Sequence, residues 1–369
     1  MKSSIDISQF TNFLQAGVIL QISIDHFRLI WGGFSTCELD SVTDLDEKTL
    51  IYRPDFWDFS NDKSGLCLKG KFESVISRAQ LLELLSEVKS DQQSIPFEIA
   101  WQPAAVTDFT EQFKWSFKKF ATGELTKSVP LIIQKGIIAF SQQHFVTALT
   151  NLIEGNHFGY TYGQWDNGIG CLGHTPELII EWRKSNAEFK TVALAGTQSL
   201  QHSNEVILQD AKILKEHQIV VDDLVEVIKM TLPDKKVIVS DIQILELKYL
   251  KHLMSTFQIN DLNENEVLLL LKQMHPSAAL GMYPRSASLY QGIQSFMLQK
   301  RRAGFAAPFG FLTKENILVV AAIRGFNFTM EKVEIFSGCG VTKQSILSDE
   351  ITELENKRNS VKRMMGMNL

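Results

Sequence analysis

Short apolar runs typical of β-strands dominate the first part of the chain, at residues 18–24 and 27–34, and a helical repeat of apolar positions follows at 80–91. From about residue 120 onward, strand-like runs occur at residues 130–140, 168–174, 177–184, 189–196, 317–328 and 333–340. Helix-like stretches are interspersed with them, at residues 205–231, 264–274 and 348–365.

The two kinds of element alternate irregularly, so the pattern predicts an α+β fold rather than a regular βαβ series. The sequence contains no internal repeat, no low-complexity tract and no long linker rich in Pro, Gly or Ser. Of its 369 residues 44% are hydrophobic and 21% are charged, which is enough apolar material for a large core. We therefore expect residues 1–369 to form a single domain.

Composition argues against several functional classes. A net charge of -5 disfavours a general binder of nucleic acid or anionic membranes, so any anionic ligand must be held by a local cationic pocket. The cysteines are far apart and form no CxxC pair, which favours reduced thiols over a zinc motif or a disulfide framework; they are Cys37, Cys67, Cys171 and Cys339. The first residues lack a signal-peptide pattern, and no apolar run reaches about 18 residues. We expect a cytoplasmic protein that neither enters nor spans a membrane.

Candidate metal chemistry lies on two predicted helices. Glu350, Glu353 and Lys357 recur at spacings of three and four, which places them on one helix face. That face resembles a metal and carboxylate site, although a solvated helix side with ordinary ion pairs has the same pattern. Glu216 on the earlier helix could supply another oxygen ligand for magnesium, which typically takes one or two protein carboxylates. The chain has no GxxxxGK[ST] loop, which argues against a nucleotide phosphate as a ligand of the metal.

Other candidate residues lie at the ends of apolar strands. Glu177 precedes such a strand, where desolvation would raise the pKa of its carboxyl group and suit it to donate a proton; an exposed turn carboxylate is the alternative. Gly196 and Thr197 end another strand, where a missing Cβ lets backbone N–H groups approach a ligand, although glycine also simply makes turns. Arg324 follows a strongly apolar run and needs an anionic partner, either a ligand carboxylate or an Asp or Glu of the protein. Segment 275–284 places the small side chains of Ser277 and Ala279 where bulk would close a pocket, and segment 301–311 packs small residues around Phe305.

Taken in order, these segments resemble the chorismate-utilising enzymes, which include isochorismate synthase, salicylate synthase, anthranilate synthase component I and aminodeoxychorismate synthase component I. The matching segments are HTPEL, ALAGT, KEHQIVVD, KHLMST, HPSAALG, FAAPFG, AAIR, GCG and the ExxExxxK helix. The resemblance implies a chorismate-binding catalytic core at residues 115–369 and a variable N-terminal part of the sheets at 1–110. It also implies a single α+β domain in which two large antiparallel sheets pack together with helices outside them.

The resemblance further implies a role for each matched residue. Glu177 would be the general acid that protonates the departing C4 hydroxyl of chorismate. Glu216 and Glu353 would hold magnesium (Mg²⁺), with Glu350 as a close or water-mediated third ligand, and the magnesium would hold the ring carboxylate. The substrate's carboxylates would be received by Arg324, Lys357 and the backbone around Gly338 and Gly340. The ring would be lined by Gly196, Thr197 and His252, and no organic cofactor is required.

Details within the motifs favour isochorismate synthase among these enzymes: the HP that opens segment 275–284, Ala279, and Phe305 in place of a frequent tyrosine. The reaction implied is a reversible, magnesium-dependent isomerisation in which water adds at C2 as hydroxide leaves C4. Chorismate would then be the partner of a monomeric enzyme.

One departure concerns the lysine base of the water-using members, because Pro130 aligns with that lysine. Lys127 lies three residues earlier and would point to the other side of a regular strand unless the proline creates a bulge. Lys135 aligns with the family's arginine. Three alternatives follow: Lys127 serves as the base, the nucleophile is ammonia supplied by a glutaminase subunit, or the protein binds chorismate-like acids without this turnover.

Overall fold

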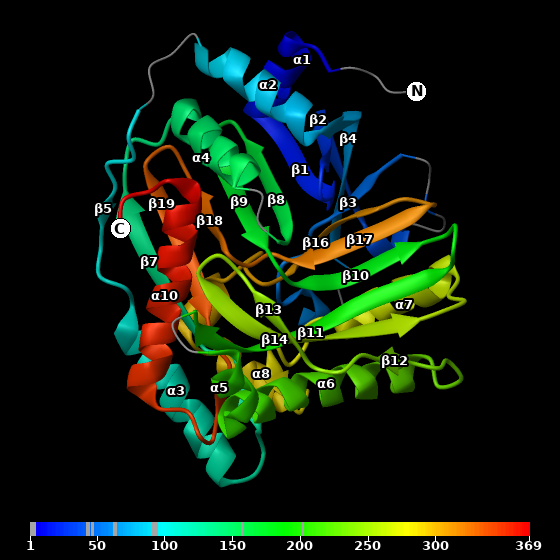
Figure 1. Ribbon diagram of the computed structural model, residues 1–369, viewed down its shortest axis with the longest axis vertical. Helices are drawn as coiled ribbons and strands as arrows, with labels where there is room; N and C mark the ends of the chain where they lie inside the picture. The colour runs from blue at the N-terminus through cyan, green and yellow to red at the C-terminus, as the bar shows by residue number, and fades with distance from the viewer. Residues whose placement is uncertain are drawn as a thin grey trace.

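The computed structural model describes residues 5–41, 45, 48–61, 65–90, 95–155, 158–200 and 203–369. Strands occupy the middle of the molecule and helices lie against them on the outside (Figure 1). The helices are α1 (Ile7–Gln15), α2 (Arg78–Ser90), α3 (Val106–Ala121), α4 (Gln142–Glu154), α5 (Asn204–Gln209), α6 (Ala211–Thr231), α7 (Glu264–Met274), α8 (Ala287–Gln294), α9 (Met297–Arg301) and α10 (Leu347–Met365).

Within the described residues, 17 strands are joined by antiparallel hydrogen bonding into one sheet. They are β1 (Ala16–Ser23), β2 (His26–Glu38), β3 (Leu50–Tyr52), β4 (Leu66–Ser77), β5 (Ala100–Trp101), β7 (Leu131–Ile137), β8 (Tyr160–Asp166), β9 (Ile169–Thr175), β10 (Leu178–Arg183), β11 (Glu188–Ser199), β12 (Ile238–Val239), β13 (Gln243–Glu246), β14 (Leu250–Ile259), β16 (Pro308–Leu312), β17 (Asn316–Ala321), β18 (Gly325–Phe328) and β19 (Lys332–Gly338). A separate three-stranded sheet contains β6 (Lys127–Ser128), β15 (Met282–Tyr283) and β20 (Val341–Thr342).

The mixed α+β class is confirmed, but the expectation of two separate packed sheets is wrong. Strand β1 pairs with β2 on one edge and with β8 on the other, and so joins two arms of strands into one sheet. One arm runs through β4, β3, β16, β17, β10, β11 and β14, and the other through β9, β18, β19 and β7. Strand β2 carries a bulge at Gly32 and Gly33, both at positive φ, where the strand can bend.

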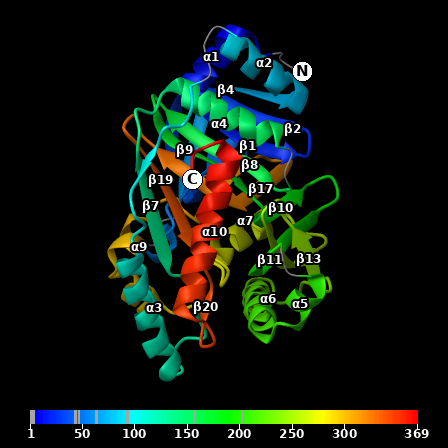
Figure 2. The same ribbon diagram turned by 60° about the vertical axis from the view of Figure 1, so that its left-hand side comes forward.

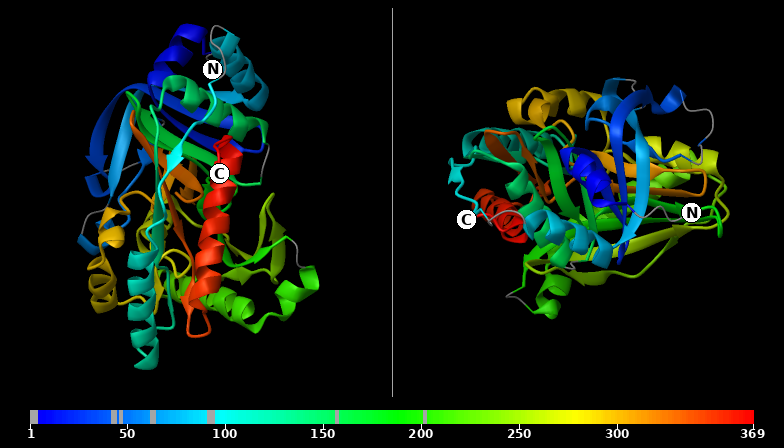
Figure 3. Two further views of the ribbon diagram at one scale, coloured as in Figure 1. Left: turned by 90° about the vertical axis from the view of Figure 1, so that its left-hand side faces the viewer. Right: turned by 90° about the horizontal axis from the view of Figure 1, so that it is seen from above.

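Helices cover this sheet in separate groups. Helices α1, α2 and α4 gather at one end of the molecule (Figures 1 and 3) and bury a cluster that includes Phe10, Phe13 and Trp31. Helix α10 packs against α4 and β19 and runs along one side (Figure 2). Helix α6 packs on β11 over a second cluster that includes Ile219 and Val220. The two helices predicted to carry the metal carboxylates therefore reach the strands from different parts of the chain.

Two predicted elements are divided in the structure. The expected helix at 205–231 is interrupted by Asp210, which is extended and caps α6 by accepting hydrogen bonds from the backbone N–H groups of Lys212 and Ile213. The expected strand at 317–328 separates into β17 and β18, because Arg324 between them has φ of +56°. Helix α2 corresponds to the helix predicted at 80–91, whose last residue lies outside the described ranges. No helix in the described part of the chain is long and apolar enough to cross a membrane.

Candidate active site

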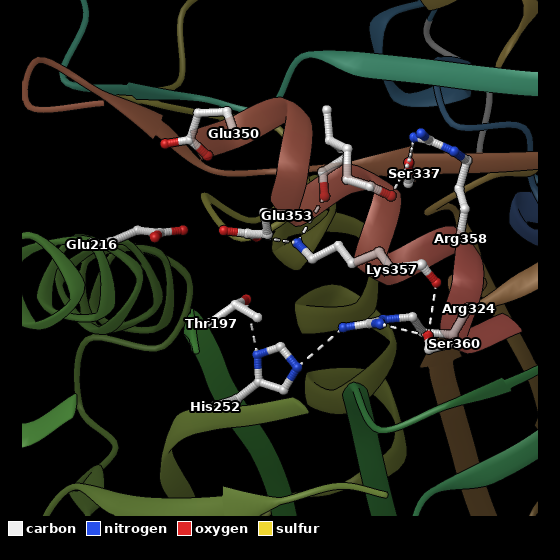
Figure 4. A network of polar contacts seen from close by, with 12 residues as sticks. Thr197, Glu216, His252, Arg324, Ser337, Glu350, Glu353, Lys357, Arg358 and Ser360 are labelled. Carbon is white, nitrogen blue, oxygen red and sulfur yellow. Dashed lines mark hydrogen bonds and ion pairs between the residues drawn. The ribbon is translucent and has the colours of Figure 1, made fainter. Parts of the chain in front are cut away.

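A cavity opens between the ends of several strands, α6 and α10, beside the turn that follows β19. Most residues predicted from the sequence line this cavity: Lys127, Glu177, Gly196, Thr197, Glu216, His252, Ala279, Phe305, Arg324, Gly338, Gly340 and Lys357. Glu350 and Glu353 are not among its lining residues and lie beside it on α10. Figure 4 shows the polar residues from α6, α10 and the strand ends facing one another. The structure therefore brings together segments that are more than two hundred residues apart along the chain.

Glu177 is a buried acid at the entrance to β10. The residue is only 6% exposed, so the alternative of an exposed turn carboxylate is wrong. Its backbone is held at both groups, since its N–H donates to Thr175 Oγ1 and its carbonyl accepts from Ala321 N–H of β17. Burial raises the pKa of the Glu177 carboxyl to about 7, against the opposing charges of Lys127, Lys357 and Arg324. An acid with this pKa can hold and deliver a proton near neutral pH.

Arg324 is held by neutral partners. Its Nη2 donates to His252 Nε2 at 3.1 Å, and its Nη1 donates to Ser360 Oγ at 3.1 Å (Figure 4). Because Nε2 accepts, Nδ1 of His252 carries the proton and donates to Thr197 Oγ1 at 3.1 Å. Burial, followed by the charges of Arg324 and Lys357, lowers the pKa of His252 well below its usual range, so the imidazole is neutral.

The charge of Arg324 consequently remains available to a ligand. Among the described residues, no carboxylate lies in ion-pair contact with its guanidinium, so pairing with an Asp or Glu of the protein is not what the structure shows. Burial lowers its pKa only to about 10, and the group stays charged at neutral pH. A planar guanidinium facing a cavity suits a ligand carboxylate.

The three predicted metal carboxylates are each paired with a lysine. Glu353 contacts Lys357 at 2.6 Å, Glu350 contacts Lys212 at 2.6 Å and Glu216 contacts Lys127 at 3.3 Å, so the described residues contain no ready cluster of three ligands. Glu350 is only 1% exposed. The alternative interpretation of this helix face, a solvated side with ordinary ion pairs, is therefore wrong for Glu350.

These carboxylates nevertheless fit a hard divalent cation. Burial raises the pKa of Glu216, with Lys127 opposing and the charges of Glu353 and Glu350 adding to the rise, which means that all three carboxylates lie within electrostatic reach. A Cβ at Gly340 would lie 1.9 Å from Glu216 Oε1, so the glycine is needed for the carboxylate to sit there. Largely buried carboxylate oxygens from two helices are the kind of donor that magnesium prefers.

Lys127 enters the same cavity from the small sheet. Its side chain is 1% exposed, and Nζ donates to the carbonyl of Ala278 at 2.8 Å beside Glu216. Residues Val129 and Pro130 separate β6 from β7, so the alternation of a regular strand does not apply to Lys127. Lys135, in contrast, lies on β7 opposite Glu334 of β19.

Two cavity contacts were not anticipated from the sequence. Arg302 lines the cavity, stacks over the Phe56 ring at 3.2 Å from its centroid, and donates to the carbonyls of Leu280 and Phe305. Its neighbour Arg301 is exposed and pairs with Glu334 instead. The sequence Arg301–Arg302 does not distinguish the two residues, because the orientation of each guanidinium depends on where helix α9 ends. Lys357 also donates to the carbonyl of Gly338 at 2.9 Å, which fixes its ammonium at the cavity wall.

The sequence is similar to those of several isochorismate synthases. Isochorismate synthase MenF of Escherichia coli is 23% identical over 279 residues, covering 71% of this chain and 61% of that protein. The salicylate biosynthesis isochorismate synthase of Pseudomonas aeruginosa is 29% identical over 205 residues, covering 50% of this chain and 40% of that protein. The chain thus spans between two fifths and about three fifths of the length of these relatives.

Solved structures show the same fold. The menaquinone-specific isochorismate synthase MenF from Escherichia coli superposes with a TM-score of 0.76 at 18% identity, over 98% of this chain and 92% of that one. Anthranilate synthase component I from Streptococcus pneumoniae gives a TM-score of 0.68 at 16% identity, over 88% and 82%. A family model described as chorismate binding enzyme matches residues 66–366, which include every residue of the cavity named above. The chain therefore belongs to the family of chorismate-binding enzymes.

Proposed function

We propose that this protein catalyses the magnesium-dependent, reversible isomerisation of chorismate to isochorismate. The observation that carries the proposal is the presence of Lys127 and Glu177 in one cavity, a candidate base and a buried acid whose pKa is raised to about 7. The reaction requires both: water must lose a proton as its oxygen bonds to C2, and the C4 oxygen must gain one as its bond to carbon breaks. The similarity to isochorismate synthases supports the same reaction.

The residues of the chain divide this work as follows. Lys127 accepts the proton of the attacking water, and Glu177 donates its proton to the departing C4 hydroxyl, which leaves as water. Arg324, held by His252 and Ser360, receives a substrate carboxylate. The reverse reaction exchanges the roles of the acid and the base.

Glu216 and Glu353, with Glu350 close by, would hold magnesium at the side of the cavity. A bound magnesium ion supplies positive charge that neutralises the ring carboxylate of the substrate. Lys357, fixed by Glu353 and the carbonyl of Gly338, adds a further positive charge at the same wall. We also propose that the chain works as a single domain whose core at residues 115–369 supplies the whole site.

Product analysis tests the proposal. Purified protein is incubated with chorismate and magnesium in oxygen-18-labelled water, with and without ammonium, and the products are separated by chromatography and identified by mass and NMR. We expect isochorismate that carries one labelled oxygen at C2, with no effect of ammonium. An aminated product that forms only with ammonium would assign the protein to the amine-forming enzymes, and binding of chorismate without any product would indicate a non-catalytic binder.

A further inference from the structure

A buried carboxylate outside the cavity holds the segment that contacts Lys127. Asp223 lies on α6, two turns beyond Glu216, and its side chain is 2% exposed. Oδ2 accepts a hydrogen bond from the backbone N–H of Ala278 at 2.8 Å. The same carboxylate pairs with Arg285 through two hydrogen bonds, to Nε at 2.7 Å and to Nη2 at 2.8 Å. Asp223 therefore ties residue 278 to residue 285 and closes the segment between them.

That closed segment holds Lys127 at two points. The carbonyl of Ala278 accepts the hydrogen bond from Lys127 Nζ at 2.8 Å, and the backbone of Tyr283 in β15 pairs with the backbone of Lys127 in β6. The N–H of one residue is thus fixed by Asp223 while the carbonyl of the same residue positions the amine. The N–H and the carbonyl of Ala278 belong to successive planar peptide groups that meet at its Cα, so only the φ and ψ of Ala278 lie between them. The turn that contains Ala278 is closed by hydrogen bonds from the N–H groups of Leu280 and Gly281 to the carbonyl of Ser277, which limits both dihedrals and therefore where the Ala278 carbonyl can lie.

The Ala278 carbonyl matters because of the other partner of Lys127. That partner is Glu216, at 3.3 Å, which is also a proposed magnesium ligand. Magnesium would compete with Lys127 for Glu216 but not for the Ala278 carbonyl. The carbonyl is therefore the contact that can hold Lys127 when the metal is bound. A lysine side chain has four rotatable bonds and keeps one geometry only when its end group is held. Displacing a catalytic group by about 1 Å can cost roughly 100-fold in rate.

We infer that Asp223 is a positioning residue, which sets the place of the Lys127 amine through the backbone of Ala278. The inference rests on the proposed role of Lys127 as the base. A purely structural alternative treats Asp223 and Arg285 as a buried ion pair that stabilises the loop and has no bearing on Lys127. The two readings differ in what happens when the ion pair is broken but the hydrogen bond to Ala278 is kept.

The kinetic test compares Asp223→Ala with Asp223→Asn. Both substitutions remove the charge opposite Arg285 and should lower the melting temperature, but the Asn amide oxygen can still accept from Ala278 N–H. We expect kcat to fall about 100-fold in Asp223→Ala with an unchanged KM for chorismate, and to fall far less in Asp223→Asn. The matched control is Asp222→Asn, an exposed neighbour on the same helix whose contact is Gln218. Equal losses of kcat in both Asp223 variants would overturn the inference.

A second variant covers the case in which Asp223→Ala does not fold. The double variant Asp223→Leu with Arg285→Met replaces the ion pair by apolar side chains of similar volume, an exchange that is often neutral for stability. It still removes the acceptor for Ala278 N–H, so kcat should fall as in Asp223→Ala. Normal kcat in a stable double variant would also overturn the inference.

Crystal structures of the variants separate this inference from the proposed function. We expect the contact between Lys127 Nζ and the Ala278 carbonyl to be lost in Asp223→Ala and kept in Asp223→Asn. If the wild-type protein forms no isochorismate, the proposed function fails, yet these structures still decide whether Asp223 positions Lys127. An unchanged contact in Asp223→Ala would show that it does not.

Discussion

Glu177 is the residue whose protonation should govern the pH dependence of the reaction. Its pKa is raised to about 7 by burial, and only the protonated form can donate to the C4 oxygen. Activity in the forward direction should therefore be present below pH 7 and decline as the pH rises through that value, measured as kcat against pH. Glu177→Gln should lower kcat by roughly 100-fold or more while calorimetry still detects chorismate binding. Full activity at pH 9 would contradict the assignment of Glu177 as the acid.

Lys127 should be the base, and Lys135 supplies its control. Removing the amine in Lys127→Ala should lower isochorismate formation by roughly 100-fold or more, the scale of losing a general base. Lys135→Ala removes a lysine from β7, where it lies opposite Glu334, and should keep near-normal turnover. Product formation is measured by chromatography for both variants. The opposite result, with Lys135 essential and Lys127 dispensable, would mean that the alignment of Pro130 with the family's lysine base is wrong.

At the scale of single residues, the sequence was most informative where an ionisable residue lies inside a segment that matches the family. The predictions for Glu177 and Arg324 identified residues that the structure places in one cavity, although their roles remain predictions. The partners of Arg324 could not be predicted, because its contact with His252 joins residues 72 apart in the chain. The position of Lys127 depended on a break at Val129 and Pro130, which a regular strand pattern cannot represent.

Among the elements, α10 depends on its final turn. Gly366 caps the helix with φ of +76°, and its N–H donates to carbonyls of the last turn. Gly366→Ala should lower the free energy of unfolding by about 1–2 kcal/mol from backbone strain alone, and by more because the new Cβ would lie 2.3 Å from Asn151 Nδ2. Gly123→Ala is the control, since Gly123 has φ of +74° but no neighbour within 4 Å of its Cβ position. Urea denaturation measures both, and equal losses would exclude the Asn151 clash.

Elements with strong apolar periodicity were predicted well, and the exceptions have local causes. Strand β10 and helix α7 fall within predicted runs, and β1, β19 and α10 begin one or two residues before theirs. Helix α3 was not predicted, although Phe109, Phe113 and Phe120 recur at the spacing of one helix face, so the signal was present in the sequence. The breaks at Asp210 and Arg324 arise from single residues whose backbone conformation is set by hydrogen bonds and tertiary contacts rather than by the apolar pattern.

Across the whole molecule, magnesium should join two helices that come from distant parts of the chain. An ion held by Glu216 on α6 and Glu353 on α10 binds the folded protein only, so it should raise the free energy of unfolding by about 2.7 kcal/mol at a hundredfold excess over Kd. The rise should disappear in Glu216→Gln and in Glu353→Gln, which should also abolish turnover. Glu355→Gln, an exposed neighbour on α10, is the control. Identical magnesium-induced shifts in melting temperature for all four proteins would contradict the metal assignment.

The architecture of the whole molecule was predicted only as far as its class. The irregular alternation of elements identified an α+β fold, but it could not show that β1 joins both arms into one sheet, because pairing across strands depends on contacts between distant segments. The bend at Gly32 and Gly33 is visible in the sequence as a glycine pair, yet its meaning becomes clear only when β4 is seen pairing on both sides of it.

The three-stranded sheet of β6, β15 and β20 has a consequence for how the protein is made. It pairs Lys127 with Tyr283 and Thr342, so a ribosome must release most of the chain before Lys127 acquires either neighbour. Until then the lysine-bearing segment is an unpaired β-strand next to the apolar run of β7, a target for chaperones and for aggregation. Assembly of the cavity should accordingly be among the last events of biosynthesis, together with the closing of the large sheet, which needs β16, β17, β18 and β19.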